Sequence, residues 1–102
     1  MAYVKKKELE LSVENYLVAR VGELGGVCDK VQVIGRRGFF DRLVVLPGGR
    51  VLFVEVKRPW GGVISPHQRQ RYAQYAALGC AVAIVRNYAD IDVLLDADKK
   101  AG

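Results

Sequence analysis

The sequence predicts an α/β (α+β) sandwich in which a central mixed β-sheet is flanked by helices. Two apolar runs, Leu43–Leu46 and Val51–Val56, are separated by Pro47-Gly48-Gly49, which is the composition of an antiparallel hairpin. Segments with helical periodicity precede and follow this hairpin. The 102 residues contain no internal repeat and no linker, so we expect a single domain over residues 1–102.

The segment before the hairpin predicts one helix and one strand. From about residue 7 to residue 24, apolar residues recur at three- and four-residue spacings, and Gly25-Gly26 then ends the predicted helix. Val27–Ile34 has an alternating pattern that indicates a strand. Gly35–Gly38, with two arginines between glycines, indicates a flexible basic loop.

A second helix and a further strand are predicted after the hairpin. Ser65 is a typical N-cap with Pro66 at the first helical position, and we expect the helix to reach about Leu78. Ala81–Val85 is wholly apolar, which is typical of a strand buried on both faces. Beyond Tyr88 a short helix and a short strand are both compatible with the sequence. The predicted order is α-β-β-β-α-β.

Composition and charge favour a basic domain with a polyanionic partner. The net charge is +5, and eleven of the sixteen Lys and Arg residues lie within residues 1–58. No apolar run approaches the roughly 20 residues of a membrane span, and no signal core follows the N-terminal lysines, so we expect a cytoplasmic protein without membrane contact. Cys28 and Cys80 lack the spacing of a zinc site and are expected to be buried thiols.

Asp41, Glu55 and Lys57 are the candidate catalytic residues. Counted outward from the hairpin turn, Asp41 and Glu55 are near cross-strand neighbours, within about 5–8 Å. Two carboxylates at this distance repel each other unless a cation neutralises them, and Mg²⁺ or Mn²⁺ would accept both, together with the backbone carbonyl of Val56. Lys57 leaves the same strand face as Glu55 and could orient water or stabilise charge on a phosphate.

The alternative is that these residues form only a polar turn and a polar strand edge. A Glu-x-Lys triplet alone would usually have that explanation. Here the neighbours of Glu55 are Val51, Leu52, Phe53 and Val54, which predict a strand buried on both faces. An unpaired Glu in such a strand costs several kcal/mol, so a functional reason is favoured.

The ordered set of motifs resembles the VRR-NUC family of the PD-(D/E)XK nuclease superfamily. The resemblance covers about residues 8–86 and rests on Val13-Glu14, Gly25-Gly26, the Gly35–Gly38 loop, Asp41-Arg42, the run Phe53–Lys57, and Ser65-Pro66-x-Gln68. One departure stands before the aspartate, where the family usually has Pro and this chain has Phe40. Pro is a backbone device there, so we expect altered local packing and intact chemistry.

The resemblance implies roles for five residues. Asp41 and Glu55 resemble the ligands of a divalent metal, Mg²⁺ or Mn²⁺, and Lys57 resembles the catalytic lysine. Glu14 resembles an additional acidic residue that binds the metal directly or through water. Gln68 resembles a glutamine that orients the lysine or the phosphate. For Glu14 and Gln68 the alternative is an ordinary solvated helix residue.

Four further residues are candidate DNA contacts. Arg36 and Arg37 lie between glycines just before the site and could clamp a backbone phosphate, or could simply be solvated. Arg42 adjoins Asp41 and is expected to add a contact. Trp60 is either a stacking platform or wedge at a distorted duplex, or a lid over the core.

We therefore expect a metal-dependent, structure-selective DNA endonuclease acting on four-way (Holliday) junctions or other branched DNA, in the cytoplasm of a bacterial or phage-infected cell. The alternatives are a less selective nuclease on flaps, nicks or duplex ends, an inactive DNA-binding module, and a structural subunit. A homodimer is expected, with two contact surfaces, unless their residues only fill the monomer's core. The surfaces are the strand Ala81–Val85 and the helix Ser65–Leu78, which has Tyr72, Tyr75 and Ala76 at neighbouring turns.

Overall fold

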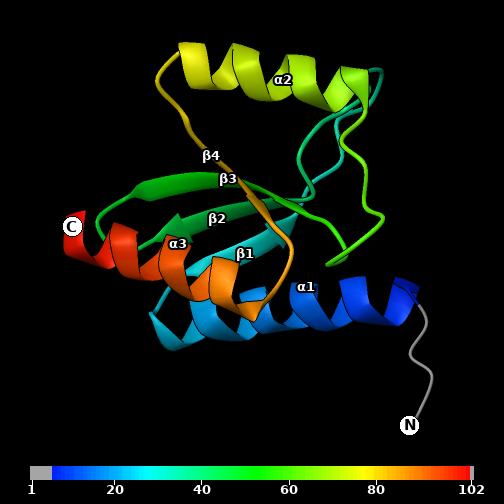
Figure 1. Ribbon diagram of the computed structural model, residues 1–102. Coiled ribbons are helices and arrows are strands. Elements are labelled where there is room, and N and C mark those ends of the chain that lie inside the picture. Colours follow the sequence, from blue (N-terminus) through cyan, green and yellow to red (C-terminus); the bar gives the residue numbers. More distant parts are fainter. Residues whose placement is uncertain (1–5, 102) are drawn as a thin grey trace, which may run out of the picture.

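The computed structural model describes the backbone of residues 6–101 and the side chains of residues 9–96. Its elements are α1 (Lys6–Glu23), β1 (Val27–Lys30), β2 (Arg42–Leu46), β3 (Arg50–Val56), α2 (Pro66–Ala77), β4 (Ala81–Val85) and α3 (Tyr88–Ala101). One four-stranded sheet separates α2 on one side from α1 and α3 on the other (Figure 1). The predicted α+β class with a mixed sheet and flanking helices is confirmed.

The sheet has the order β1-β2-β3-β4, with antiparallel pairing from β1 to β3 and parallel pairing of β4 with β3. Parallel neighbours need a long crossover connection, and α2 supplies it. β4 is therefore an edge strand. The predicted burial of this strand on both faces is wrong. Val85 is buried, but Ala81 and Ile84 are exposed, because no other strand of the described residues 6–101 lies beyond β4 and the helices cover it only in part.

Two other segments differ from the sequence-based expectation. The first strand is shorter than predicted and ends at Lys30, because the chain then leaves the sheet toward α2. Gly35 and Gly38 turn this connection with φ angles of 79° and 76°, which an L side chain rarely adopts. Near the C-terminus, the segment for which the sequence allowed a helix or a strand is a helix, α3. Its first turn is capped by Asn87, whose Oδ1 accepts a hydrogen bond from Asp90 N at 2.8 Å.

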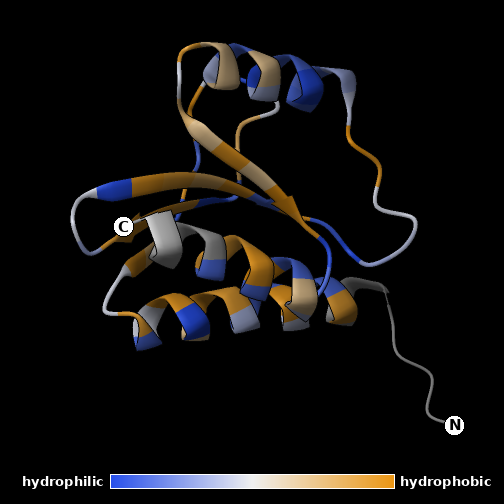
Figure 2. Ribbon diagram, turned by 60° about the vertical axis from the view of Figure 1, so that its left-hand side comes forward, coloured by the Kyte–Doolittle hydropathy of each residue, from blue (hydrophilic) through white to orange (hydrophobic). Residues whose placement is uncertain are grey.

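The main hydrophobic core lies between the sheet and the α1–α3 layer, and Figure 2 shows the strands coloured as largely hydrophobic. Alternation along β2 and β3 sends every second side chain into this core. Its fully buried members are Val13, Leu17, Val21, Val44, Leu46, Leu52, Val54, Val56, Val85, Ile91 and Leu95. The other strand face is thereby left for α2 and for the candidate site.

An aromatic cluster joins α2 to the sheet. It consists of Phe39, Phe40, Phe53, Tyr72 and Tyr75. Phe40 is its centre, 1% exposed, with its ring stacked on Tyr72 at a centroid distance of 4.8 Å. Tyr72 and Tyr75 thus face inward and are not free for a contact between subunits. Phe40 packs at the position where the family usually has Pro.

Two expectations about the chain as a whole have mixed outcomes. Within residues 6–101, no helix combines the length and the apolar character that a membrane crossing requires. Cys28 and Cys80 are free thiols, but each is half-buried instead of fully buried. Burial raises the pKa of Cys28 above its usual value, which keeps this thiol protonated and unreactive.

Candidate active site

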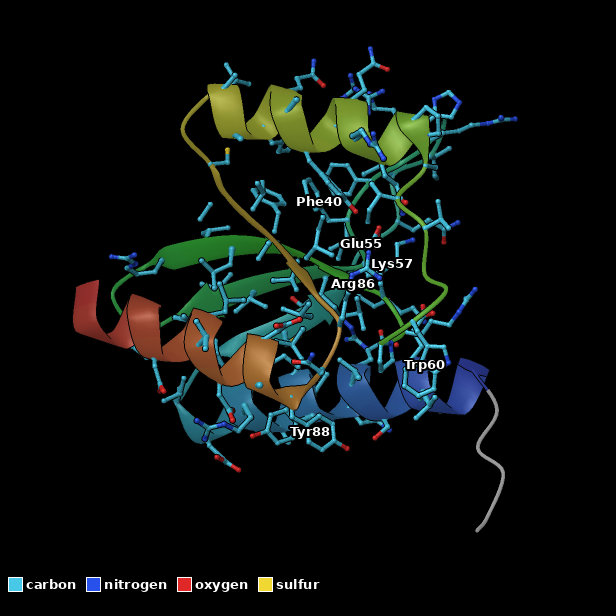
Figure 3. All side chains as sticks on the ribbon, in the orientation of Figure 1. Phe40, Glu55, Lys57, Trp60, Arg86 and Tyr88 are labelled. Carbon is cyan, nitrogen blue, oxygen red and sulfur yellow. The ribbon has the colours of Figure 1, made fainter. Side chains whose placement is uncertain are left out.

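Strand register brings the central residues together. Arg42 of β2 pairs with Val54 of β3, so the next positions, Asp41 and Glu55, lie opposite each other. Side-chain alternation places Asp41, Glu55 and Lys57 on the sheet face that α2 covers. Figure 3 shows Glu55 and Lys57 side by side at the end of β3. This arrangement is the one that the hairpin count predicts.

Glu55 is the buried acid of the site, with 1% of its surface exposed. Its Oε2 accepts hydrogen bonds from the Gln68 amide and from the Tyr72 hydroxyl, the latter at 2.8 Å. Burial, followed by the hydrogen bond with the Asp41 carboxyl and its negative charge, raises the Glu55 pKa from 4.5 to about 8. Tyr72 and Lys57 lower it in part. The charged form of Glu55 therefore calls for a further positive charge.

The backbone holds Asp41 in place. Its Oδ2 accepts from Val56 N at 3.0 Å, and its carbonyl accepts from Val31 N at 3.0 Å. Asp41 is thus tied to β3 by its side chain and to the chain after β1 by its main chain. This double attachment keeps the half-buried Asp41 carboxylate facing Glu55.

The N-terminus of α2 fixes the orientation of Gln68. Ser65 Oγ accepts from Gln68 N at 3.1 Å, and Gln68 Oε1 accepts from Ser65 N at 3.0 Å, which together form a capping box. With its oxygen occupied by the cap, the Gln68 amide nitrogen points at Glu55. Gln68 belongs to this group of side chains as the sequence suggests, but the partner of its amide is the Glu55 carboxylate and not Lys57.

Tyr72 is a further residue of the candidate site, whereas the sequence suggested it as a contact between subunits. It lies one helical turn after Gln68 on the same face of α2. Burial, and then the hydrogen bond to Glu55, raise the pKa of Tyr72 well above its usual value, so the hydroxyl remains a donor. The available signal was the four-residue spacing from Gln68, which places both side chains above the same strand.

Glu14 and Arg42 form a separate pair. Arg42 Nε and Nη2 both lie 2.9 Å from Glu14 Oε2, and Arg42 Nη1 donates to the Cys28 carbonyl at 3.2 Å. Both side chains are 16% exposed. Arg42 points to the α1 side of the sheet, because it alternates with Asp41 along β2. The structure therefore brings Glu14 to Arg42 and not to the Asp41–Glu55 pair.

The basic loop docks on the first turn of α2. A Cβ on Gly38 would lie 2.4–2.6 Å from backbone atoms of His67 and Gln68, so only glycine permits this approach. Arg71 Nε donates to the Arg37 carbonyl at 3.4 Å and links the loop further to the helix. The side chains of Arg36 and Arg37 are exposed next to the N-terminal half of α2.

Trp60 is 60% exposed, which contradicts the alternative that it closes the core. The main core is instead completed by aliphatic side chains of α1, α3 and the sheet. Trp60 lies in the connection that follows β3, and its label lies below that of Lys57 in the view of Figure 3. The large indole is thus exposed to solvent, three residues after Lys57 in the chain.

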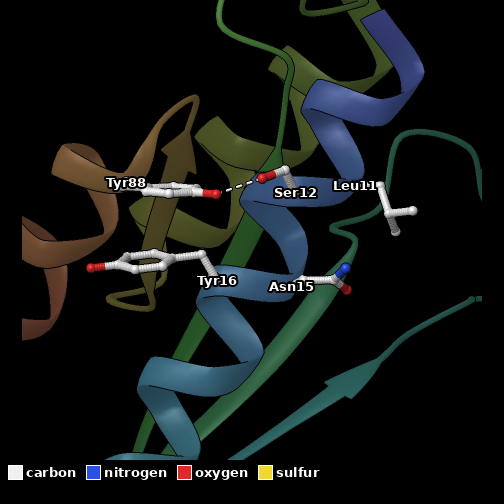
Figure 4. A pocket seen from close by; sticks show the side chains of 5 residues that line it. All are labelled: Leu11, Ser12, Asn15, Tyr16 and Tyr88. Carbon is white, nitrogen blue, oxygen red and sulfur yellow. Dashed lines mark hydrogen bonds between the residues drawn. The ribbon is translucent and has the colours of Figure 1, made fainter. Parts of the chain in front are cut away.

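A shallow hollow between α1 and α3 is a separate feature (Figure 4). Tyr16 and Tyr88 stack there with centroids 4.2 Å apart, and the hydroxyls of Ser12 and Tyr88 are 2.5 Å apart. Tyr16 also donates to Asp92 at 2.7 Å. These contacts join the two helices on the side of the sheet opposite Glu55, so the hollow is part of the packing of this layer.

The donor set of the site is compatible with a hard divalent cation. Asp41 and Glu55 supply two facing carboxyl groups, and burial together with Asp41 raises the pKa of Glu55, an effect that a nearby cation would oppose. Among residues 9–96, no group of three or more His, Cys, Asp and Glu side chains could hold a metal ion. A cation would therefore need backbone and water oxygens as well, which Mg²⁺ accepts readily.

Two facing carboxylates, the buried Glu55 and the half-buried Asp41, lie with Lys57 at the end of a hairpin on a mixed sheet between helices, which is a PD-(D/E)XK-like nuclease arrangement. No family model matches the chain. It is 43% identical over 88 residues to "Putative nuclease p44" of Acyrthosiphon pisum secondary endosymbiont phage 1, covering 86% of this chain and 92% of that protein.

A solved structure titled "VRR_NUC domain" is 34% identical, with a TM-score of 0.81, and the match covers 85% of this chain and 94% of that one. A second, titled "VRR_NUC domain protein", has a TM-score of 0.70 over 99% of this chain and 93% of that one. At 15% identity it shows a likeness of fold alone. The chain belongs to the VRR-NUC family, and these relatives support nuclease function.

Proposed function

We propose that this chain is a metal-dependent DNA endonuclease that hydrolyses phosphodiester bonds selectively in branched DNA, such as four-way (Holliday) junctions. The observation that carries the proposal is the face-to-face placement of Asp41 and Glu55 beside Lys57 at one end of the sheet. Glu55 is buried with a raised pKa, which is an unfavourable state for a purely structural carboxylate.

Asp41, Glu55 and the Val56 carbonyl would hold Mg²⁺ or Mn²⁺. When bound, the cation supplies positive charge to the carboxylates and the phosphate and makes water a better nucleophile at neutral pH. The chain's own residues do the rest. Lys57 is placed to stabilise negative charge on the phosphate or to orient water, while Gln68 and Tyr72 hold the Glu55 carboxylate in position.

Glu14 is proposed to support the site through Arg42. The two-pronged pair is only 16% exposed, and Arg42 is the chain neighbour of Asp41, so the pair fixes the start of β2 against α1. Direct or water-mediated metal binding by Glu14 would require Arg42 to release it, and so would a contact between Arg42 and DNA. Binding of a phosphate to Arg42 would free Glu14 at the same time.

DNA is proposed to cross the N-terminal half of α2. The exposed side chains of Arg36, Arg37 and Arg69 lie there, with the half-buried Arg71 between loop and helix. The sequence of α2 contains no acidic residue, and Figure 2 shows the hydrophilic colour mainly in the N-terminal half of this helix. Gln68 on the same helix contacts Glu55, so phosphates bound to these arginines lead toward the acid pair.

A homodimer would give a branched substrate two sites related by symmetry. The edge strand β4 offers a contact surface, because its outer edge has no strand partner within residues 6–101 and its Ala81 and Ile84 are exposed. Leu78, 78% exposed at the end of α2, adds apolar surface just before β4. Tyr72 and Tyr75 face the sheet and are not part of this proposed contact.

The test is cleavage of labelled four-way junction, flap, nicked duplex and linear duplex, each with EDTA, Mg²⁺ or Mn²⁺. The proposal expects metal-dependent cuts and a preference for the junction. Equal cutting of flaps, nicks and ends would replace it by the less selective nuclease. Tight binding without cleavage under any metal would leave a DNA-binding module with an inactive site.

A further inference from the structure

The connection Arg58–Gly62 is folded tightly against the catalytic strand. Gly61 turns it with φ 75°, and Arg58 Nη2 donates to the Gly61 carbonyl at 2.7 Å. A Cβ on Gly62 would lie 3.1 Å from Lys57 Cβ and 3.2 Å from Arg86 Nη1. The loop therefore returns to contact the stem of the candidate catalytic lysine.

Arg86 holds this loop in place. Val56 pairs with Val85 in the parallel register, so Arg86 follows β4 where Lys57 follows β3, and Lys57 N donates to the Val85 carbonyl at 3.0 Å. The Arg86 Nη1 donates to the carbonyl of Gly62 at 2.8 Å and to that of Arg58 at 3.4 Å. One guanidinium thus bridges both ends of the loop.

The position of Arg86 is itself fixed. Its backbone N–H donates to Asp90 Oδ2 at 2.9 Å, which ties the residue to the first turn of α3. Figure 3 shows Arg86 next to Lys57 and Glu55. Trp60 lies farther from them, on the Arg58–Gly62 loop. The bridged loop carries Trp60 at its middle, 60% exposed. An indole held in water by a fixed loop is poorly explained by packing alone.

We propose that Arg86 is a positioning residue of the site. By bridging the Arg58–Gly62 loop next to Lys57, it presents Trp60 as a stacking surface for an unpaired or unstacked base beside the reacting phosphate. The inference rests on the proposed function in taking DNA as the ligand, and it deepens it by assigning the selection of distorted DNA to this loop. Every base has a π-face, so stacking selects exposed bases without selecting sequence.

Trp60 is the chain's single tryptophan, so its fluorescence reports directly on the loop. The experiment titrates metal-free protein in EDTA with a duplex containing one unpaired thymine and with the matched full duplex. The bulged duplex should quench the fluorescence of Trp60 and immobilise its indole. The full duplex should have a much smaller effect on both. Trp60→Leu should reduce the affinity for bulged DNA on the order of tenfold and leave affinity for the full duplex nearly unchanged.

Arg86→Gln tests the bridge. It should increase acrylamide quenching of Trp60 in the free protein and reduce the preference for bulged DNA to the level of Trp60→Leu. The double variant should lose no more than Trp60→Leu alone, because both changes remove one effect. Arg86→Lys keeps the charge but lacks the planar fork, so it should resemble Arg86→Gln. Arg20→Gln, which removes one charge on the α1–α3 side, should keep the preference.

Three results would overturn the inference. Trp60 fluorescence that does not respond to the bulged duplex would exclude stacking. Equal loss of affinity for both DNAs in Arg86→Gln, or full preference in Arg86→Lys, would make Arg86 a simple charge. Cleavage with Mn²⁺ separates these failures from failure of the nuclease proposal: if wild type still cuts DNA, only the loop assignment is wrong. Absence of both binding and cleavage would refute the proposed function, and the loop assignment with it.

Discussion

Replacement of Glu55 by Gln should make the metal-free protein more stable at high pH. Gln keeps the shape of Glu, and its carbonyl can accept the hydrogen bonds of Gln68 and Tyr72. Its amide can donate to Asp41, as the protonated Glu55 does. The variant therefore imitates the neutral acid and removes only the ionisation.

The size of the effect follows from the Glu55 pKa. Burial and Asp41 raise it from 4.5 in the unfolded chain to about 8 in the folded protein. For a raised pKa, the stabilising contribution is complete below pH 4.5 and is lost as the pH rises through about 8. At about 1.4 kcal/mol per pH unit, the full loss has an upper bound of roughly 5 kcal/mol. This is a large part of the stability of a small domain.

Urea denaturation in EDTA at pH 5 and pH 9 measures this loss. Wild type and Glu55→Gln should be similarly stable at pH 5, and the variant should be the more stable protein at pH 9 by several kcal/mol. Mg²⁺ at pH 8 should restore stability to wild type alone, by about 2.7 kcal/mol at a hundredfold excess over its Kd. Parallel pH profiles for the two proteins would refute the assignment of Glu55 as a buried acid awaiting a cation.

Three other outcomes are expected. Tyr72→Phe should fold, because the ring still stacks on Phe40. It should reduce the cleavage rate about tenfold or more and shift the pH profile of cleavage upward, because a hydrogen-bond donor that favours ionised Glu55 is lost. An unchanged pH profile would assign Tyr72 to packing. Arg36→Ala with Arg37→Ala should lower the slope of log affinity against log salt by about two without changing unfolding, and an unchanged slope would mean plain solvation. Sedimentation at micromolar concentration should give about twice the 11.3 kDa chain mass, whereas a monomer that cuts junctions symmetrically would contradict the dimer.

The hairpin and the helix after it could be predicted from local sequence because each rests on short-range chemistry. Pro47-Gly48-Gly49 fixes the turn, and the turn fixes the register that sets Asp41 opposite Glu55. Ser65 and Pro66 similarly fix the start of α2. Residue positions that depend on local pairing could therefore be predicted from the sequence alone.

The edge position of β4 and the partners of Glu14 could not be predicted in this way. An apolar run such as Ala81–Val85 is compatible with a central strand and with an edge strand, and only the strand order distinguishes them. Glu14 faces inward, as its helical spacing suggests. Its partner is Arg42, because alternation along β2 points Arg42 toward α1 and Asp41 away from it. The loop that carries Trp60 is likewise bridged by Arg86, a residue 26 positions later in the chain than Trp60.

The most direct test of the nuclease assignment compares wild type with Asp41→Asn, Glu55→Gln and Lys57→Ala on one labelled four-way junction, with Mn²⁺ and with EDTA. Wild type should cut only with the metal. Each variant should lose cleavage by several orders of magnitude while binding the junction in EDTA nearly as wild type does, and calorimetric metal binding should disappear in the two carboxylate variants. Cleavage by Glu55→Gln at the wild-type rate, or by wild type in EDTA, would contradict the assignment of this carboxylate pair as the metal site of a nuclease.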